Sequence, residues 1–564
     1  MKIEEKLLTF NPDQKDMFNI LETQKIHQFR VPTGVGKGYV MILHILNSII
    51  NSDNKIFAIA SHRLSLNNQH LRDLIELSIK FGLISKVKFL TVGSAALNIS
   101  KVLQEDLLLN VAFNKSLFDY NKTLDIRSRI TASDIFKSTL SSSQVNQTLK
   151  NNSESGFKTI IVTTYNSLDK LGDNELDIIY LDEAHILASN NQDADFKKNY
   201  DRIKSKKRFF FTATPKDVEE QYLKDNESSD VFLMNNKAIF GDVYTIPFVK
   251  CVKSAYICKP VIHIAHPVDY QDGVNYDSIG NKAKFVTDTF KAHEKWLKSV
   301  SFLPNEIEPK VLVRCESVPH MWDMYKKLSD IVPKDIIVCA GASYNDNGDD
   351  KHAFGNEWIS NRDEFIKNIQ TVKDTQKMII LNFDIFSEGI NVPGITGVLF
   401  LQGKMPSIAK VIQNVGRSTR LHKFDRDRLR NGEIGVDDYS KWVKPYCAVI
   451  IPYWDVASES TKRLLADTVR KLRDSWEFDP HFILSVGDDM ADGDGENSDE
   501  GLNKLNKGNK KAKLIEEINQ EIETLEKNDM DLKERERLQG MSKLDLLKEK
   551  IGMTDNWFKK QNSI

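Results

Sequence analysis

The sequence has few cysteines, no long apolar run and almost no net charge. Its five cysteines in 564 residues are scattered and form no C-x-x-C pair, which argues against a disulfide framework or a zinc site. The longest apolar stretch, residues 40–50, is interrupted by His44, Asn47 and Ser48. The first ten residues also lack the apolar core of a signal peptide. We therefore expect an intracellular, cytoplasmic protein with no membrane segment.

The charge balance gives no sign of a nucleic-acid binder. Lys and Arg total 78, Asp and Glu total 80, and the net charge is -2 at pH 7. Any basic track along the surface must therefore be local. A chain of 564 residues is too long for one hydrophobic core, so two or three domains are expected.

Short β-rich runs alternate with helical patterns, which is typical of α/β lobes built on parallel sheets. The first series, within residues 1–230, has the runs HQFRV, KIFAIAS, VKFLTVG, TIIVTTY, DIIYLDE and RFFFTAT. The second series, within 259–486, has VIHIAHPV, KVLVRC, DIIVCAG, KMIILNF, GVLFLQG and AVIIPY. We expect two similar lobes in tandem, joined by residues 231–258.

Three segments stand apart from these series. Residues 108–157 are a polar stretch, either an insertion that contacts substrate or a tolerated surface excursion. Residues 487–503 are acidic and Gly-rich, as expected of a flexible linker. They resemble a calcium loop poorly, because Asn497 and Asn503 replace its turn glycine and bidentate glutamate. The Lys/Glu-rich composition of residues 504–564 predicts a charged helical tail, which is either a helix that docks a protein partner or a solvated helix.

The strongest local motif is PTGVGKG, which follows one expected strand and precedes a helical run. A Gly-rich turn in this position points backbone N–H groups at phosphate, and the helix N-terminus adds its positive dipole end. Lys37 would neutralise the β- and γ-phosphates. Taken alone, the motif is also compatible with a structural turn. The predicted nucleotide contacts are Thr33, Gly34, Val35, Gly36, Lys37 and Gly38.

The segment DIIYLDEAH places Asp182 and Glu183 at the end of an apolar strand. Two acids there are costly unless they hold magnesium and activate a water; the alternative is an exposed acidic turn. Asp182 would bind the metal, and Glu183 would accept the proton of the attacking water. FFFTATP ends the next strand with Thr212 and Thr214, whose hydroxyls can hydrogen-bond His185 and relay the nucleotide state.

PTGVGKG, DEAH and TATP resemble motifs I, II and III of superfamily 2 helicases. FSEGINVP resembles motif V, and QNVGRSTR resembles motif VI. The segment FGDVYTIPFVKCVKSAYIC resembles the lobe-joining segment of the branch with restriction-enzyme motor subunits and phage recombination helicases. The resemblance covers residues 10–475. It implies two RecA-like lobes that hydrolyse ATP, with Mg²⁺, at their shared cleft.

The resemblance assigns roles to further residues. Arg417 and Arg420, three apart on one helix face, would reach the γ-phosphate as arginine fingers, and Gln413 belongs to the same motif. Gly389 of motif V would contact the nucleotide, and Gln14 of FNPDQ would read adenine. The positions that would grip a nucleic-acid backbone are Ser61 and Arg63 (motif Ia), Thr163, Thr164 and Ser167 (motif Ib) and Arg314 (motif IV).

One position departs from the family. Motif I usually ends in G-K-T or G-K-S, whose hydroxyl ligates magnesium, whereas this chain has Gly38. The resemblance implies an ATP-dependent helicase or translocase, with DNA favoured over RNA as its partner because of the branch it resembles. Gly38 motivates the alternative, a nucleic-acid-binding regulatory protein with a weakened ATPase. An RNA helicase is a further alternative.

Overall fold

The computed structural model describes 9–62, 64–93, 136–139, 141–188, 195–216, 232–265, 278–342, 352–360, 362–383, 392, 394–401, 408–452, 463, 466–467, 469–470, 472–473, 484–486, 516 and 520–527. The chain divides into two compact units, Met1–Val261 with Asp277–Val449, and Ile262–Tyr276 with Ile450–Ile564. Within the described ranges, no helix has the length and apolar character needed to cross a membrane.

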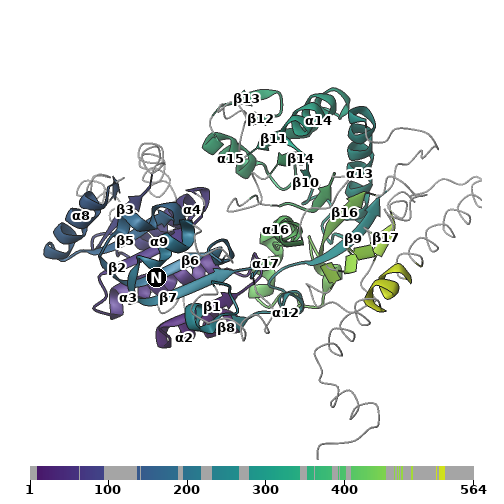
Figure 1. Ribbon diagram of the computed structural model, residues 1–564. Helices are drawn as coiled ribbons and strands as arrows, with labels where there is room; N and C mark the ends of the chain where they lie inside the picture. The colour runs from purple at the N-terminus through teal and green to yellow at the C-terminus, as the bar shows by residue number, and fades with distance from the viewer. Residues whose placement is uncertain are drawn as a thin grey trace, which may run out of the picture. The chain divides into compact units, whose positions relative to one another are not determined.

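The first sheet has eight strands in the order β4-β3-β5-β2-β6-β7-β1-β8. Figure 1 labels β3, β5, β2, β6, β7, β1 and β8 of this sheet. All its described pairings are parallel. Each of the six strands expected in the first series is present. The strands are β1 (Ile26–Arg30), β2 (Ile56–Ser61), β3 (Val87–Val92), β4 (Phe136–Thr139), β5 (Lys158–Thr164), β6 (Glu175–Asp182), β7 (Lys204–Thr212) and β8 (Asp242–Thr245).

Apolar composition explains the central strands of this sheet. Seven of the eight residues of β6 are buried, from Leu176 to Asp182. Parallel strands that are covered on both faces consist of nearly continuous apolar residues. The residues that follow such a strand lie at the carboxyl edge of the sheet. Asp182 and Glu183 therefore emerge at the edge where ligands bind in open α/β sheets.

Helices connect the strands of the first sheet. They are α2 (Pro12–Thr23), α3 (Lys37–Asn51), α4 (Leu64–Lys80), α8 (Ser142–Glu154) and α9 (Asp195–Asp201), with short 3₁₀ helices η1 (Tyr165–Leu171) and η2 (Ala184–Ile186). Helix α2 begins with a capping box, in which Asn11 and Gln14 satisfy each other's backbone N–H groups, and with proline at its first position.

The end of the polar stretch 108–157 forms a strand and a helix of the lobe, which its polar composition did not indicate. Strand β4 extends the sheet beside β3, and α8 buries Val145 and Leu149 in the core of the lobe. These positions are four apart, so a mainly polar helix still has one apolar side to pack. The preceding part of the stretch lies outside the described residues.

The second sheet has nine strands in the order β13-β12-β11-β14-β10-β15-β16-β9-β17. The six expected strands are again present. A hairpin of β12 and β13, which pairs antiparallel to β11, was not predicted, nor was β17. The strands are β9 (Lys259–Ala265), β10 (Lys310–Arg314), β11 (Ile336–Ala342), β12 (His352–Phe354), β13 (Glu357–Ile359), β14 (Lys377–Phe383), β15 (Gly397–Phe400), β16 (Tyr446–Pro452) and β17 (Leu484–Val486).

The remaining helices are α11 (Lys237–Phe240), α12 (Phe248–Lys253), α13 (Ile279–Val300), α14 (Val318–Ile331), α15 (Arg362–Thr371), α16 (Ile408–Ser418), α17 (Lys423–Arg430) and the 3₁₀ helix η3 (Tyr439–Lys441). The fold is α/β with two RecA-like sheets, as expected. Of the predicted C-terminal helical tail, Glu516 and 520–527 are described, and they are helical. An ion pair joins Glu526 of this helix to Arg473. The predicted linker at 487–503 lies outside the described residues.

Candidate nucleotide site

The loop PTGVGKG joins β1 to α3, as the motif predicts. Gly34 and Gly36 have φ values of 96° and 93°, which an L-residue rarely adopts. A Cβ on Gly36 would also lie 2.7 Å from Nε2 of Gln14. Helix α3 then begins at Lys37, and its N-cap residue, Gly36, has no side chain to accept hydrogen bonds from the first backbone N–H groups. Its first backbone N–H groups and its dipole thus suit an anion such as phosphate.

Gln14 fixes this loop to helix α2. Its Nε2 donates to the carbonyl of Val35 at 3.0 Å, and its Oε1 accepts from the backbone N–H of Asn11 at 3.2 Å. The preceding residue, Asp13, is buried and accepts hydrogen bonds from Tyr244, Lys250 and Tyr256. The start of α2 therefore contacts both the Gly-rich loop and the predicted lobe-joining segment.

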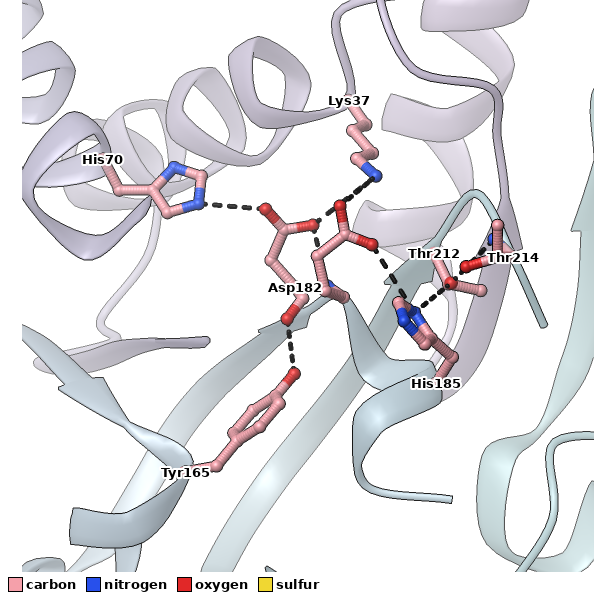
Figure 2. Close-up of polar contacts among 8 residues, drawn as sticks. Lys37, His70, Tyr165, Asp182, His185, Thr212 and Thr214 are labelled. Atoms are coloured by element: carbon pink, nitrogen blue, oxygen red, sulfur yellow. Dashed lines mark hydrogen bonds and ion pairs between the residues drawn. The ribbon is translucent and has the colours of Figure 1, made fainter. Parts of the chain in front are cut away.

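Lys37 lies against the two acids at the end of β6. Its Nζ is 3.8 Å from Oδ1 of Asp182 and 3.4 Å from Oε1 of Glu183 (Figure 2). Burial lowers the pKa of Lys37, but the carboxylates of Glu183 and Asp182 outweigh that effect, so the pKa is raised. Lys37 is therefore a cation at neutral pH, at the position predicted to meet phosphate.

Asp182 is buried and held from several sides. Its Oδ2 is 3.0 Å from Nε2 of His70, its Oδ1 accepts from the backbone N–H of Glu183 at 3.0 Å, and its carbonyl accepts from the hydroxyl of Tyr165 at 2.5 Å. Burial raises the pKa of Asp182, but the opposing effects of Lys37 and His70 are larger, and the net result is a pKa lowered to about 2. The carboxylate is thus ionised and preorganised.

Glu183 has a strained backbone. Its φ of 55° lies in the left-handed region, which costs a non-glycine residue about 1–2 kcal/mol. Such strain is found mainly where the surrounding structure requires a particular side-chain direction, often at active sites. Here the turn directs the carboxylate toward Lys37 and His185, whose Nδ1 is 3.5 Å from Glu183 Oε2.

His185 connects this acid to the end of β7. Its Nδ1 is 2.9 Å from Oγ1 of Thr212, which also accepts from the backbone N–H of Thr214 at 3.0 Å (Figure 2). Burial is the largest of the effects that lower the pKa of His185, so the ring is neutral at pH 7. The predicted contact of His185 with Thr212 is present, whereas Thr214 joins the network through its backbone.

Of the predicted arginine fingers, Arg417 lies at the end of α16, whereas Arg420 lies two residues beyond it, so the two do not share one helix face as expected. Arg417 is buried, and its positive charge partly opposes the carboxylates that raise the pKa of Lys37. A Cβ on Gly34 would lie 3.7 Å from Cγ of Arg420. Burial, and then Arg417, lower the pKa of Arg420, but a guanidinium still keeps its proton at pH 7. Gln413 is buried on the same helix. These cations lie close to the Gly-rich loop.

Comparison with known proteins finds a family match and similar folds. Residues 7–217 match the family described as "Type III restriction enzyme, res subunit". The DNA-bound type ISP restriction-modification enzyme LlaBIII is similar in structure, with a TM-score of 0.53 and 15% identity over 91% of this chain and 33% of that one. At 15% identity, this likeness shows a shared fold. It spans about a third of the length of LlaBIII.

Two other solved structures have lower TM-scores. A nuclease-deletion mutant of the type ISP enzyme LlaGI, in complex with a DNA substrate mimic, has a TM-score of 0.46 and 14% identity over 85% of this chain and 30% of that one. Dbp5 of S. cerevisiae, bound to RNA and ADP BeF3, has a TM-score of 0.46 and 13% identity over 88% of this chain and 92% of that one. No protein of curated function matches the chain.

The acid at the end of β6 can be tested for its fit to a magnesium ion bound with a nucleotide. No cluster of three or more His, Cys, Asp or Glu side chains with metal-site geometry occurs in the part of the chain that the structure describes. Magnesium bound with a nucleotide needs only one or two carboxylates beside phosphate oxygens and waters. Asp182, ionised and at the sheet edge, fits that requirement. Gly389, the predicted motif V contact, lies outside the described residues.

The predicted backbone-gripping residues are mostly buried. The hydroxyl of Ser61 donates to Asn67 at 2.7 Å, that of Thr163 to the carbonyl of Val92 at 2.9 Å, and that of Thr164 to Ser167 at 3.3 Å. Arg314 is buried in β10, with its guanidinium 5.9 Å from the ring centre of Phe383. Arg63 lies outside the described residues. These nucleic-acid contacts stay predictions.

Sequence reasoning missed three residues of the site. His70 and Tyr165 hold Asp182, and Asp13 holds the start of α2. His70 lies only one residue beyond the segment ASHRLSLNNQ that marks motif Ia, but no local pattern links it to an acid 112 residues away.

Proposed function

We propose that this protein is an ATP-dependent helicase or translocase that acts on nucleic acid, with DNA favoured over RNA. The observation that carries the proposal is the arrangement of Lys37, Asp182 and Glu183 around the Gly-rich loop, with Nζ 3.8 and 3.4 Å from the two acids. A cation, a metal-binding acid and a catalytic base are the parts that ATP hydrolysis requires at one place.

In this proposal the γ-phosphoryl group lies between the loop and the end of β6. Amide N–H groups at the start of α3 and the ammonium of Lys37 bind the phosphates. Glu183 orients the attacking water and takes its proton. Asp182 would hold Mg²⁺, which neutralises developing charge on the phosphates when bound. His185 and Thr212 would pass the state of Glu183 to the end of β7.

Arg417 and Arg420 complete the electrostatics. Burial, and then the positive charge of Arg417, lower the pKa of Arg420, so the two neighbouring guanidinium groups repel each other. A phosphate placed between them would offset this repulsion, most strongly in the charged transition state. We therefore assign them to stabilisation of the transition state.

The preference for DNA rests on family. Residues 7–217 match the res subunit of type III restriction enzymes, and LlaBIII, the similar structure above, is bound to DNA. The main alternative is a nucleic-acid-binding regulatory protein with a weakened ATPase, and one observation favours it. Gly38 provides no hydroxyl for magnesium at the second position of α3.

The test is steady-state ATP turnover of the full chain alone and with single-stranded DNA, duplex DNA, forked DNA and RNA. We expect turnover that nucleic acid stimulates and that DNA stimulates more than RNA. Lys37→Ala is the control that should abolish it. Absence of hydrolysis at every magnesium and manganese concentration, with each polymer present, would replace the motor by the regulatory alternative. Greater stimulation by RNA would reverse the DNA preference.

A further inference from the structure

Gly38 is not required by the backbone. It is the second residue of α3, and its φ lies outside the left-handed region that favours glycine. Among the described residues other than its two chain neighbours, a Cβ built at this position would meet one side chain within 4 Å, that of His70, at 3.5 Å from Cε1 and 3.8 Å from Nδ1. The space that a motif I hydroxyl would enter is therefore bordered by an imidazole.

His70 has one ring nitrogen engaged and one available. It is 3% exposed on α4, and its Nε2 lies 3.0 Å from Oδ2 of Asp182 (Figure 2). Because an ionised carboxylate only accepts hydrogen bonds, Nε2 must carry the proton of this bond. In the tautomer with its proton on Nε2, Nδ1 has a lone pair. Nδ1 is buried and has no hydrogen-bond partner among the described residues.

We propose that His70 is a positioning residue for the nucleotide-bound cation and does the work of the hydroxyl that Gly38 lacks. Its Nε2–H orients the Asp182 carboxylate, and its Nδ1 accepts a hydrogen bond from a water of the hydrated cation. Magnesium keeps several waters in nucleotide sites, so a water can replace a hydroxyl ligand if a protein group holds it. This inference rests on the proposed ATP site.

The space around position 38 explains why glycine there occurs together with His70. A Cβ at 3.5 Å makes an ordinary contact with the ring, but the two branches of a threonine would extend beyond that Cβ. Threonine at 38 and histidine at 70 therefore compete for the same volume. The two positions should respond to substitution as a pair, with non-additive effects.

The experiment measures equilibrium binding of Mn²⁺ by the full chain with saturating ADP, from the electron paramagnetic resonance signal of free Mn²⁺. ADP binding without metal is measured in parallel. The variants are His70→Ala, Gly38→Thr and the double variant. His44→Ala is the matched control, because His44 is also buried in this lobe but hydrogen-bonds Tyr180.

We expect His70→Ala to weaken Mn²⁺ binding about 10- to 100-fold, the usual effect of losing a group that holds a metal's ligand. Metal-free ADP affinity should not change, since the loop and Lys37 remain. Gly38→Thr in the His70→Ala background should restore most of the Mn²⁺ affinity, whereas Gly38→Thr alone should not improve it. His44→Ala should lower thermal stability and leave Mn²⁺ affinity unchanged.

Two results would overturn the inference. One is Mn²⁺ affinity of His70→Ala within about twofold of the wild type, well inside the tenfold loss expected. The other is a loss that Gly38→Thr fails to restore, because His70 would then not replace the hydroxyl. If His70→Ala does not fold, His70→Leu retains the volume and carries the same expectations. Failure of the wild type to bind ADP at all would instead count against the proposed ATP site.

Discussion

Lys444 offers a test of how the predicted arginine fingers are held. Its side chain is 1% exposed, and its Nζ donates to the carbonyls of Ser418 at 2.5 Å and Arg420 at 2.7 Å. A cation at the C-terminal end of a helix satisfies unpaired carbonyls and complements the helix dipole. Lys444→Met keeps the length of the side chain and removes the ammonium, leaving the end of α16 without this support.

The magnitude follows from the two lost hydrogen bonds. Hydrogen bonds to a charged group contribute about 1.5–3 kcal/mol each, so their loss costs about 3–6 kcal/mol. Methionine avoids burying a charge, which returns part of this cost. We expect a net loss of about 2–4 kcal/mol in unfolding free energy. We also expect a 10- to 100-fold lower kcat, roughly what displacement of a catalytic group by about 1 Å costs.

The assay is urea unfolding followed by circular dichroism, with ATP turnover measured at saturating nucleic acid. Lys441→Met is the matched control: Lys441 is half-exposed and pairs with Asp438 at 3.1 Å. Its loss should cost less than about 1 kcal/mol, as for other surface ion pairs. A Lys444→Met protein that loses no more stability than this control, and keeps normal kcat, would refute the reasoning.

Other predictions concern the base, the arginine finger and pH. Glu183→Gln should bind ATP but lower kcat by about 10²–10⁴, because an amide cannot accept a proton; unchanged kcat would exclude Glu183 as the base. Arg420→Ala should lower kcat by ~10³ or more while metal-free ADP affinity persists; near-normal kcat in the folded variant would refute its assignment. Burial is the largest effect lowering the pKa of His44 and of His293 to about 3, from 6.5. Both are neutral when folded and take up protons on unfolding below pH 6.5, so stability is complete above that pH and falls toward pH 3. Each histidine should lower the free energy of unfolding by about 1.4 kcal/mol at pH 5.5 relative to pH 7.5, measured by urea unfolding. If His44→Leu left the pH dependence of the unfolding free energy unchanged, this prediction would be contradicted.

The sequence could predict the parts of the fold that local pattern determines. Continuous apolar runs identified the central strands, and the acids after DIIYL had to lie at the carboxyl edge because β6 is buried along its length. Strand β4 and helix α8 were missed because their composition is polar and only a few residues, such as Val145 and Leu149, reach the core. The hairpin of β12 and β13 has three residues per strand, too few for a period to show.

In the candidate site, too, some residues could be predicted from local motifs and others could not. Motif order identified Lys37, Asp182 and Glu183, and the structure brings these three together. Residues that act by long-range contact carry no such signal. His70 meets Asp182 across 112 residues, and Asp13 meets Tyr256 across 243. The buried hydroxyls of Ser61 and Thr163 show the converse: a motif can locate a residue correctly while its side chain is used inside the lobe.

Gln14 shows how far a motif assignment can be tested by counting hydrogen bonds. One N–H of its amide is given to Val35 and one lone pair of its oxygen to Asn11. A glutamine amide has a second N–H and a second lone pair, so it can still donate to one atom of adenine and accept from another. Adenine recognition by Gln14 is therefore compatible with its structural role. The two existing bonds also fix the amide orientation, because a flipped amide would place its oxygen against the carbonyl of Val35.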